Sequence, residues 1–327
     1  MKKHLEGKVA IVTGSGQGIG KGLAVGLARE GAKIITNNRK PNGLSASTFR
    51  KEDMPEEDWK ELCKLKGDAE TTAALIKEEG GEAIPFYGDC SDWNTAKEMI
   101  ETAIKEWGRI DIIVNNAAGT GTGSVENMTE ENWDHFNAGR TKAAIALMHF
   151  AFPYMKEQGF GRIINVASDA WVGLAGNSGY SCSTAGMVGL TYATSKELDQ
   201  FGITVNCICP QGASPAHAVE YNKLIREISA VGHAPDPKIL ASVAADHGDP
   251  ANIAPFITVL CEEDGAYING SIFSVTSAGK VKMYSYPQCG SMLFNDGNLW
   301  NVDVLKEKVK ADLTGPDYAA PGKLYGW

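Results

Sequence analysis

A glycine-rich segment near the N-terminus is the first part of this chain whose residue types and spacing could do chemistry. Residues 13–20 read TGSGQGIG, after an apolar run at 8–13 that predicts a buried strand and before a helical pattern over 18–30. Glycines let a backbone approach a pyrophosphate closely, and the free N–H groups at a helix N-terminus attract its charge. This context of strand, tight turn and helix predicts a dinucleotide phosphate-binding loop. The alternative is a glycine-rich turn that holds no ligand.

The elements that must position this loop follow a regular alternation of apolar runs and helical patterns. Such alternation predicts a parallel sheet with helices on both faces, so we expect a single α/β domain with a doubly wound Rossmann fold and a seven-stranded parallel sheet. Sheets of this kind bind ligands at the carboxyl ends of their strands. The expected strands are residues 8–13, 33–36, 83–86, 110–114, 162–167, 204–208 and 271–275, and the expected helices are 18–30, 69–79, 93–107, 130–157 and 180–200.

Two stretches lie outside this alternation. Residues 40–68 are polar, with an acidic run at 52–58, and we interpret them as a surface insertion between the second strand and its helix. Residues 280–327 are rich in Tyr, Asn, Gly and Pro, and we interpret them as a C-terminal extension that wraps the domain or a neighbouring subunit. The 327 residues are thus expected to form one domain, 1–279, followed by this extension.

Composition and charge argue against several classes of protein. The net charge of −9 argues against a nucleic-acid-binding groove. No apolar run reaches the ~18 residues of a membrane span, and the N-terminus shows no apolar signal core. The seven cysteines are odd in number and several fall in expected strands and helices, so we expect reduced thiols and a cytoplasmic location. His217, His233 and His247 lack metal-ligand spacing, so we expect no metal site and interpret them as solvated loop residues.

The spacing of the glycine-rich segment resembles that of the short-chain dehydrogenase/reductase family, and further motifs in the family's order extend the resemblance over roughly residues 6–278. Asp89 ends the third strand, where the family's aspartate contacts adenine. Asn115 begins an Asn-Asn-Ala run after the fourth strand, with Ala118 in place of the family's glycine. Residues 210–212 read Pro-Gln-Gly after the sixth strand, where the family usually has Pro-Gly beside the nicotinamide.

The resemblance implies a catalytic serine and a catalytic tyrosine. Members of the family transfer a hydride between the nicotinamide and a carbinol or carbonyl carbon, while a tyrosine acts as general acid or base and a serine polarises the substrate oxygen. Ser168 lies seven residues after Gly161, and Tyr180 lies twelve residues after Ser168, close to the family's spacing. Outside this register, a loop serine and a helical tyrosine would be structural residues.

Two positions of the implied active site depart from the family. Thr184 stands where the family's lysine holds the nicotinamide ribose, and Arg140 stands where the family has an asparagine. Counting seven residues after Trp133 and counting 21 residues before Gly161 both lead to Arg140. We interpret the two departures as coupled, because Arg140 would restore a positive charge beside Tyr180 and favour the phenolate. The alternatives are that Arg140 binds a carboxylate or phosphate of the substrate, or that it points outward.

The end of the second strand bears on the choice of cofactor. NAD-dependent members of the family often carry an aspartate there, which binds the ribose 2′-hydroxyl and repels a 2′-phosphate. This chain has Asn38 followed by Arg39 and Lys40, which favours NADP. The alternative is NAD, since Asn38 could bind a hydroxyl, and the two cations could also be solvated loop residues. The cofactor-binding residues that the resemblance implies are Gly14, Ser15, Gln17, Gly18, Ile19, Gly20, Asn38, Arg39, Asp89, Cys90, Asn115, Ala117, Tyr180, Thr184, Pro210, Gly212 and Ala213.

Three features narrow the resemblance to one branch of the family: the insertion, Gln211 and the C-terminal extension. Together they are similar to the (3R)-hydroxyacyl-CoA dehydrogenase branch, although that branch keeps the lysine. The implied substrate is a small β-hydroxy or β-keto compound, with a CoA thioester as one form. Residues 213–250 would then form a substrate lid. Family members usually form dimers or tetramers through helices matching 130–157 and 180–200, which implies a homo-oligomer.

The sequence therefore predicts an NAD(P)-dependent short-chain alcohol dehydrogenase or carbonyl reductase. The missing lysine keeps a second class open, that of a non-catalytic nucleotide-binding subunit which has lost its chemistry. Dinucleotide-dependent isomerase or dehydratase chemistry is a third class, which no residue pattern in this chain favours.

Overall fold

The computed structural model describes residues 3–41, 51–118, 123–215, 217, 222, 226, 237–289, 291–294 and 301–314. The chain divides into two units, Met1–Tyr284 and Ser285–Trp327. The described part of the second unit contains α11 (Val302–Lys308), which continues into a π-helical turn, Val309–Thr314. Of the predicted lid, only residues 213–215, 217, 222, 226 and 237–250 are described.

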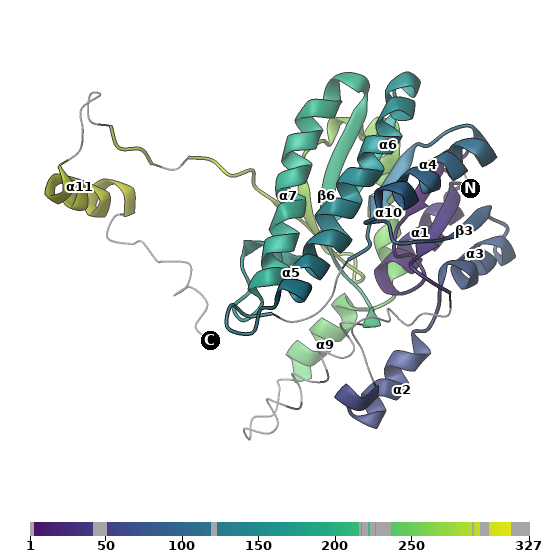
Figure 1. The fold of residues 1–327 in the computed structure, drawn as a ribbon, viewed down its shortest axis with the longest axis horizontal. Coiled ribbons are helices and arrows are strands. Elements are labelled where there is room, and N and C mark those ends of the chain that lie inside the picture. Colours follow the sequence, from purple (N-terminus) through teal and green to yellow (C-terminus); the bar gives the residue numbers. More distant parts are fainter. Residues whose placement is uncertain are drawn as a thin grey trace. The chain divides into compact units, whose positions relative to one another are not determined.

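The first unit is built on an eight-stranded sheet in the order β3-β2-β1-β4-β5-β6-β7-β8. Figure 1 shows this sheet with helices packed around it. Strands β1 to β7 are parallel, and β8 runs antiparallel to β7. The strand order reverses where β1 separates β2 from β4, which confirms the doubly wound Rossmann fold predicted from the sequence. The strands are β1 (Val9–Val12), β2 (Lys33–Asn38), β3 (Ala83–Tyr87), β4 (Ile112–Asn115), β5 (Gly161–Val166), β6 (Ile203–Gln211), β7 (Ile272–Thr276) and β8 (Val281–Tyr284).

The predicted number of strands is wrong by one. We expected seven parallel strands, whereas β8 adds an antiparallel eighth strand and draws residues 281–284 of the predicted extension into the sheet. Gly279, with a φ of +81°, lies in the turn between β7 and β8. Three of the four β8 residues are exposed. The strand therefore lacks the continuous apolar run by which the other strands were predicted.

Helices cover both faces of the sheet, and neighbouring residues of one strand enter two different hydrophobic cores. Ile11 and Ile113 belong to one core, and Val12 and Val114 belong to the other. This alternation follows from the period of two in a strand. The first face is covered by α4 (Trp93–Trp107), α6 (Ala143–Gln158) and α7 (Ser178–Leu198), and the second by α1 (Gly18–Arg29), α3 (Ala69–Glu78) and α10 (Ala254–Cys261).

The helical stretch predicted over residues 130–157 is interrupted. It forms α5 (Glu130–Asn137) and α6, which are joined by a π-helical turn, Ala138–Lys142. A π-helical turn holds an extra residue, so it changes the direction in which its side chains point, and it occurs often at functional sites. Arg140 lies in this turn.

The predicted insertion, residues 40–68, contacts the segment predicted as a lid. Asp58 accepts hydrogen bonds from Arg226 Nη2 at 2.6 Å and from Asn222 Nδ2 at 3.0 Å. The hydrogen bond from Arg226 lowers the pKa of Asp58. The insertion contains α2 (Glu56–Lys64), and the segment predicted as a lid contains α9 (Pro237–Asp246).

Short 3₁₀ turns occur along the described chain at Lys51–Asp53, Asp169–Val172, Asp199–Phe201, Pro250–Ile253 and Asp264–Tyr267.

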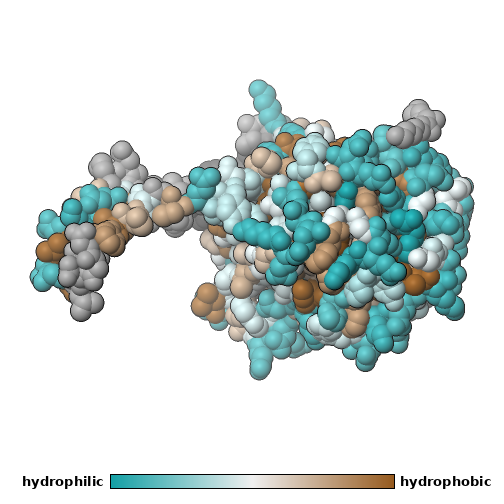
Figure 2. All heavy atoms as spheres, turned by 90° about the horizontal axis from the view of Figure 1, so that it is seen from above, coloured by the Kyte–Doolittle hydropathy of each residue, from teal (hydrophilic) through white to brown (hydrophobic). Residues whose placement is uncertain are grey.

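Hydrophilic residues predominate on the face shown in Figure 2, with hydrophobic residues scattered among them. The larger hydrophobic side chains lie mainly in the two cores. Within the described part of the chain, we find no helix with the length and apolar character that crossing a bilayer requires.

Candidate active site

The glycine-rich segment forms a tight turn between the end of β1 and the start of α1. Gly14 and Gly18 have φ values of +61° and +51°, a left-handed conformation that glycine adopts without strain. A β-carbon at Gly20 would lie 2.5 Å from the carbonyl oxygen of Gly14, so this close approach also requires glycine. The side chain of Gln17 does not cap α1, which leaves the first N–H groups of the helix available to an anion.

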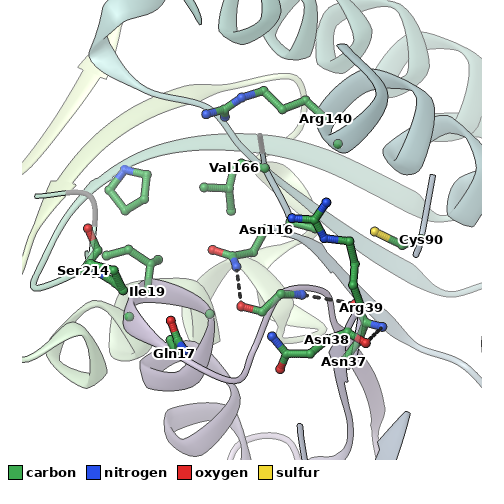
Figure 3. A pocket seen from close by; sticks show the side chains of 18 of the residues that line it. Gln17, Ile19, Asn37, Asn38, Arg39, Cys90, Asn116, Arg140, Val166 and Ser214 are labelled. Atoms are coloured by element: carbon green, nitrogen blue, oxygen red, sulfur yellow. Dashed lines mark hydrogen bonds between the residues drawn. The ribbon is translucent and has the colours of Figure 1, made fainter. Parts of the chain in front are cut away.

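A cavity of about 600 Å³ lies at this loop and at the carboxyl ends of the parallel strands (Figure 3). Its volume falls within the range of small-molecule and cofactor sites. Most of the site residues predicted from the sequence line it together. They are Gly14, Gln17, Gly18, Ile19, Gly20, Asn38, Arg39, Asp89, Cys90, Ala117, Arg140, Ser168, Tyr180, Pro210 and Gly212.

Three of the predicted cofactor-binding residues lie behind this cavity and support its loops. Ser15 is fully buried, and its hydroxyl accepts a hydrogen bond from the backbone N–H of Asn37 at 2.8 Å. Asn115 Nδ2 donates to Asn165 Oδ1 at 2.9 Å, between β4 and β5. The backbone N–H of Ala213 donates to a backbone carbonyl oxygen at 2.9 Å.

Thr184 lies on α7 one turn after Tyr180, and it is the fourth predicted residue outside the cavity lining. It is fully buried, and its hydroxyl lies 3.1 Å from the carbonyl oxygen of Tyr180 and 3.0 Å from that of Ser181. Helical threonines commonly bond to a preceding carbonyl in this way. The position of the family's lysine therefore presents no charged group to the cavity.

Arg140 projects from the π-helical turn into the cavity (Figure 3). It is only 4% exposed, and its Cζ lies 4.6 Å from the centre of the Tyr180 ring. Among the described residues, its Nε has no hydrogen-bond partner and no ion pair includes it. The alternative that Arg140 points outward is wrong. A buried guanidinium without a counter-ion is unfavourable, so this part of the cavity favours a negatively charged group.

The cavity carries positive charge although the whole chain has a net charge of −9. Arg39, Lys40 and Arg140 line it, and Asp89 is the one acidic side chain among its described lining residues. Burial raises the pKa of Cys90 to about 12, so this thiol stays neutral. The excess of cations favours an anionic ligand such as a dinucleotide.

Two asparagines that the sequence interpretation missed hold the glycine-rich loop. Asn37 Oδ1 accepts a hydrogen bond from the backbone N–H of Gly14 at 3.3 Å, and Asn116 Nδ2 donates to the carbonyl oxygen of Thr13 at 2.9 Å. Both residues also line the cavity. Their position beside predicted residues, at the carboxyl ends of β2 and β4, was the signal that could have identified them.

His217 and His247 lie in the wall of the cavity and are partly exposed, a location that our interpretation of them as solvated loop residues did not include. Their rings are stacked, with centroids 3.5 Å apart and an angle of 6° between the planes. Burial is the main cause that lowers the pKa of His217 to about 4, and the charge of His247 is the second. The two residues are far apart in sequence, so no local pattern could pair them. His233 lies outside the described residues.

A glycine-rich loop, a serine and a tyrosine line one cavity at the carboxyl ends of a doubly wound sheet, an arrangement typical of dinucleotide-dependent oxidoreductases. The chain belongs to the short-chain dehydrogenase family, since the family model described as "short chain dehydrogenase" matches residues 53–224. Members of this family bind NAD(P).

The chain is similar to several known proteins. The peroxisomal hydratase-dehydrogenase-epimerase of Neurospora crassa is 31% identical over 96% of this chain, which spans 31% of that protein. The hydroxyacyl-CoA dehydrogenase ChsB1 of Mycobacterium tuberculosis is 28% identical over 96% of this chain and 90% of its own length. A short chain dehydrogenase from Mycobacterium avium has a crystal structure that matches 94% of both chains with a TM-score of 0.71 and 25% identity. The family and the fold predicted from the sequence are thus confirmed.

Proposed function

We propose that this protein interconverts a hydroxyl and a carbonyl group on a small β-hydroxy or β-keto compound. The observation that carries the proposal is that Ser168 and Tyr180 line the same cavity as the glycine-rich loop. A bound nicotinamide would supply or accept the hydride. The protein's own residues then bind the dinucleotide, orient the substrate oxygen and move one proton.

Ser168 and Tyr180 are the proposed catalytic residues. Ser168 Oγ accepts a hydrogen bond from the backbone N–H of Ala170 at 3.3 Å, which leaves the hydroxyl hydrogen for donation to a substrate oxygen. The Tyr180 phenol would give a proton to that oxygen in reduction and take one in oxidation. Phe136 is 1% exposed and packs edge-on against the Tyr180 ring at a centroid distance of 6.4 Å, which helps to fix the ring.

Arg140 is the proposed source of positive charge beside Tyr180. The support for this role is its burial and the 4.6 Å between its Cζ and the Tyr180 ring centre. Thr184 presents only its own helix-bonded hydroxyl, so it cannot supply that charge. A permanent cation at this distance would stabilise negative charge that develops on the tyrosine and on the substrate oxygen during proton transfer.

The proposed substrate class follows from the likeness to named relatives. One is the hydroxyacyl-CoA dehydrogenase ChsB1, and another is the 3-oxoacyl-[acyl-carrier-protein] reductase FabG of Thermotoga maritima, which is 28% identical over 83% of this chain. Both names describe a hydroxyl or keto group on an acyl chain. We therefore place a β-hydroxy or β-keto acyl compound first among the substrates to be tested.

The proposed cofactor is NADP. Arg39 and Lys40 line the cavity at the end of β2, where Asn38 carries no charge that would repel a 2′-phosphate. One observation favours NAD as the second candidate. Asn38 Oδ1 is buried and has no hydrogen-bond partner among the described residues, and a ribose 2′-hydroxyl could donate to it.

Replacing Arg39 by alanine should lower kcat/KM with NADPH by about 10- to 100-fold, because a hydrogen bond to a charged phosphate is lost. The value with NADH should change far less. Steady-state rates with both cofactors measure the effect, and the exposed Lys77→Ala is the matched control, since Lys77 lies away from the cavity. Equal losses with the two cofactors, or a wild-type preference for NADH, would favour NAD.

The proposed function is tested by following the absorbance of NADPH and NADH during incubation with ketones, aldehydes and β-ketoacyl thioesters. We expect turnover, with the β-ketoacyl thioesters as the best substrates. Thr184 favours one rival, a non-catalytic nucleotide-binding subunit. Tight binding of NADP⁺ or NAD⁺ without turnover on any member of the panel would support that rival.

A further inference from the structure

Asp169 directly follows Ser168 and connects it to three strands of the sheet. Asp169 Oδ2 accepts hydrogen bonds from Gln211 Nε2 at 3.0 Å and from Ser274 Oγ at 2.9 Å. Its Oδ1 accepts one from the Tyr284 hydroxyl at 2.8 Å. The donors belong to β6, β7 and β8, respectively. Hydrogen bonds to a carboxylate are stronger than those between neutral groups, so this carboxylate joins four segments firmly.

Gln211 links this carboxylate to the turn that the family places beside the nicotinamide. Its neighbours Pro210 and Gly212 line the cavity, whereas the Gln211 amide binds Asp169 outside the described lining. The backbone carbonyl oxygen of Gln211 also accepts a hydrogen bond from the N–H of Ser277 at 2.9 Å. The residue that departs from the family's Pro-Gly motif therefore has a defined partner, and that partner is adjacent to the catalytic serine.

Tyr284 brings β8, the strand that the sequence did not predict, to the same carboxylate. Its ring packs edge-on against Trp171 with centroids 5.2 Å apart and an angle of 81° between the planes. Burial and, second, the hydrogen bond to Asp169 raise the pKa of Tyr284. The phenol therefore keeps its proton and remains a hydrogen-bond donor.

We propose that Asp169 is a positioning residue that holds Ser168 and the 210–212 turn in one fixed geometry, with Tyr284 of β8 as its outer support. This inference rests on the proposed function, because it assigns the role of Asp169 through Ser168. Misplacing a catalytic group by about 1 Å can lower a rate by roughly 10²-fold. A carboxylate that ties the segment after β5 to β6, β7 and β8 restricts such displacement.

The Tyr284→Phe variant tests the outer support while keeping the ring that packs on Trp171. We expect kcat to fall by about 10-fold, with KM changed little, because loss of this hydrogen bond would let Ser168 shift by a fraction of the ~1 Å that costs roughly 10²-fold in rate. The Tyr267→Phe variant is the matched control, because Tyr267 is 82% exposed, and its kcat should equal that of the wild type. A wild-type kcat for Tyr284→Phe would overturn the proposal.

Combining Tyr284→Phe with Ser168→Ala separates positioning from a general structural role. If Tyr284 acts through Ser168, adding Tyr284→Phe to the Ser168→Ala variant should lower the residual kcat no further. A purely structural contribution would lower kcat by the same factor in both backgrounds, and that result would contradict the proposal. Thermal unfolding of each variant verifies that the fold is retained.

A binding measurement tests the inference without turnover. Wild-type protein should bind NADP⁺ more tightly than 2′-phospho-ADP-ribose, or NAD⁺ more tightly than ADP-ribose, because the family resemblance places the 210–212 turn against the nicotinamide half. Asp169→Ala should lose most of this difference, and Asp169→Asn, which keeps one acceptor oxygen, should lose less. An unchanged difference in Asp169→Ala overturns the positioning role. Absence of wild-type turnover, with the binding difference still lost in Asp169→Ala, would overturn only the proposed function.

Discussion

Replacing Tyr180 by phenylalanine should lower turnover by about 10²- to 10⁴-fold, the range that general acid–base catalysis contributes. The variant keeps the aromatic ring, and with it the contacts to Phe136 and Arg140. The affinity for NADP⁺ should therefore stay close to that of the wild type. Initial rates with a β-ketoacyl thioester, together with a binding titration, measure both quantities.

The control for this prediction is Tyr192→Phe on the same helix. Tyr192 lies about three turns further along α7 and does not line the cavity, so its variant should turn over like the wild type. If Tyr180→Phe keeps turnover within a few-fold of the wild type, Tyr180 is not the acid or base of this reaction.

Replacing Arg140 by alanine should have the second-largest effect, a loss of roughly 10²-fold in turnover, similar to the removal of one preorganised charge-stabilising donor. The loss should be greatest in alcohol oxidation, in which the tyrosine must take up a proton, and turnover is measured in both directions over a range of pH. Carbonyl reduction needs the protonated phenol and should suffer less. Arg140→Lys keeps the charge and should retain more activity than Arg140→Ala. Unchanged turnover together with an unchanged pH profile in Arg140→Ala would contradict the proposal that Arg140 supplies positive charge to the reaction at Tyr180.

A second substitution tests whether Arg140 takes over the role of the lysine that the family has at position 184. Thr184→Lys in the Arg140→Ala background restores the family's residue on α7 and should recover part of the lost turnover. Thr184→Lys alone places a second cation near a buried guanidinium, so it should lower both turnover and the midpoint of thermal unfolding. If the double variant folds but turns over no faster than Arg140→Ala, the changes at positions 140 and 184 are not coupled.

Local patterns made the Rossmann fold and the glycine-rich loop predictable. The first seven strands contain short runs of apolar residues between helical patterns, and the glycines at 14 and 18 stand where the loop adopts positive φ values. Counting from two independent landmarks also led to Arg140. The side-chain direction of Arg140 was not predictable, because it depends on a π-helical turn within a pattern that reads as a continuous helix.

Contacts between distant parts of the chain account for what the sequence did not show. The partners of Asp169 come from residues 211, 274 and 284, and no spacing rule joins them. The stacking of His217 on His247 likewise depends on how two remote segments pack. Thr184 was predicted to bind the cofactor because it stands at the position of the family's lysine. Its hydroxyl instead bonds to a carbonyl oxygen of its own helix.

The eighth strand also bears on how the protein can be shortened and handled. A terminal strand of a sheet exposes unpaired N–H and C=O groups that can recruit a second chain. Here β8 pairs with the edge of β7 that would otherwise be unpaired. The new edge strand, β8, is short and carries the exposed Lys282. A truncated variant ending at residue 279 would uncover the β7 backbone and invite strand-to-strand aggregation. Shortened forms of this chain should therefore extend at least through Tyr284.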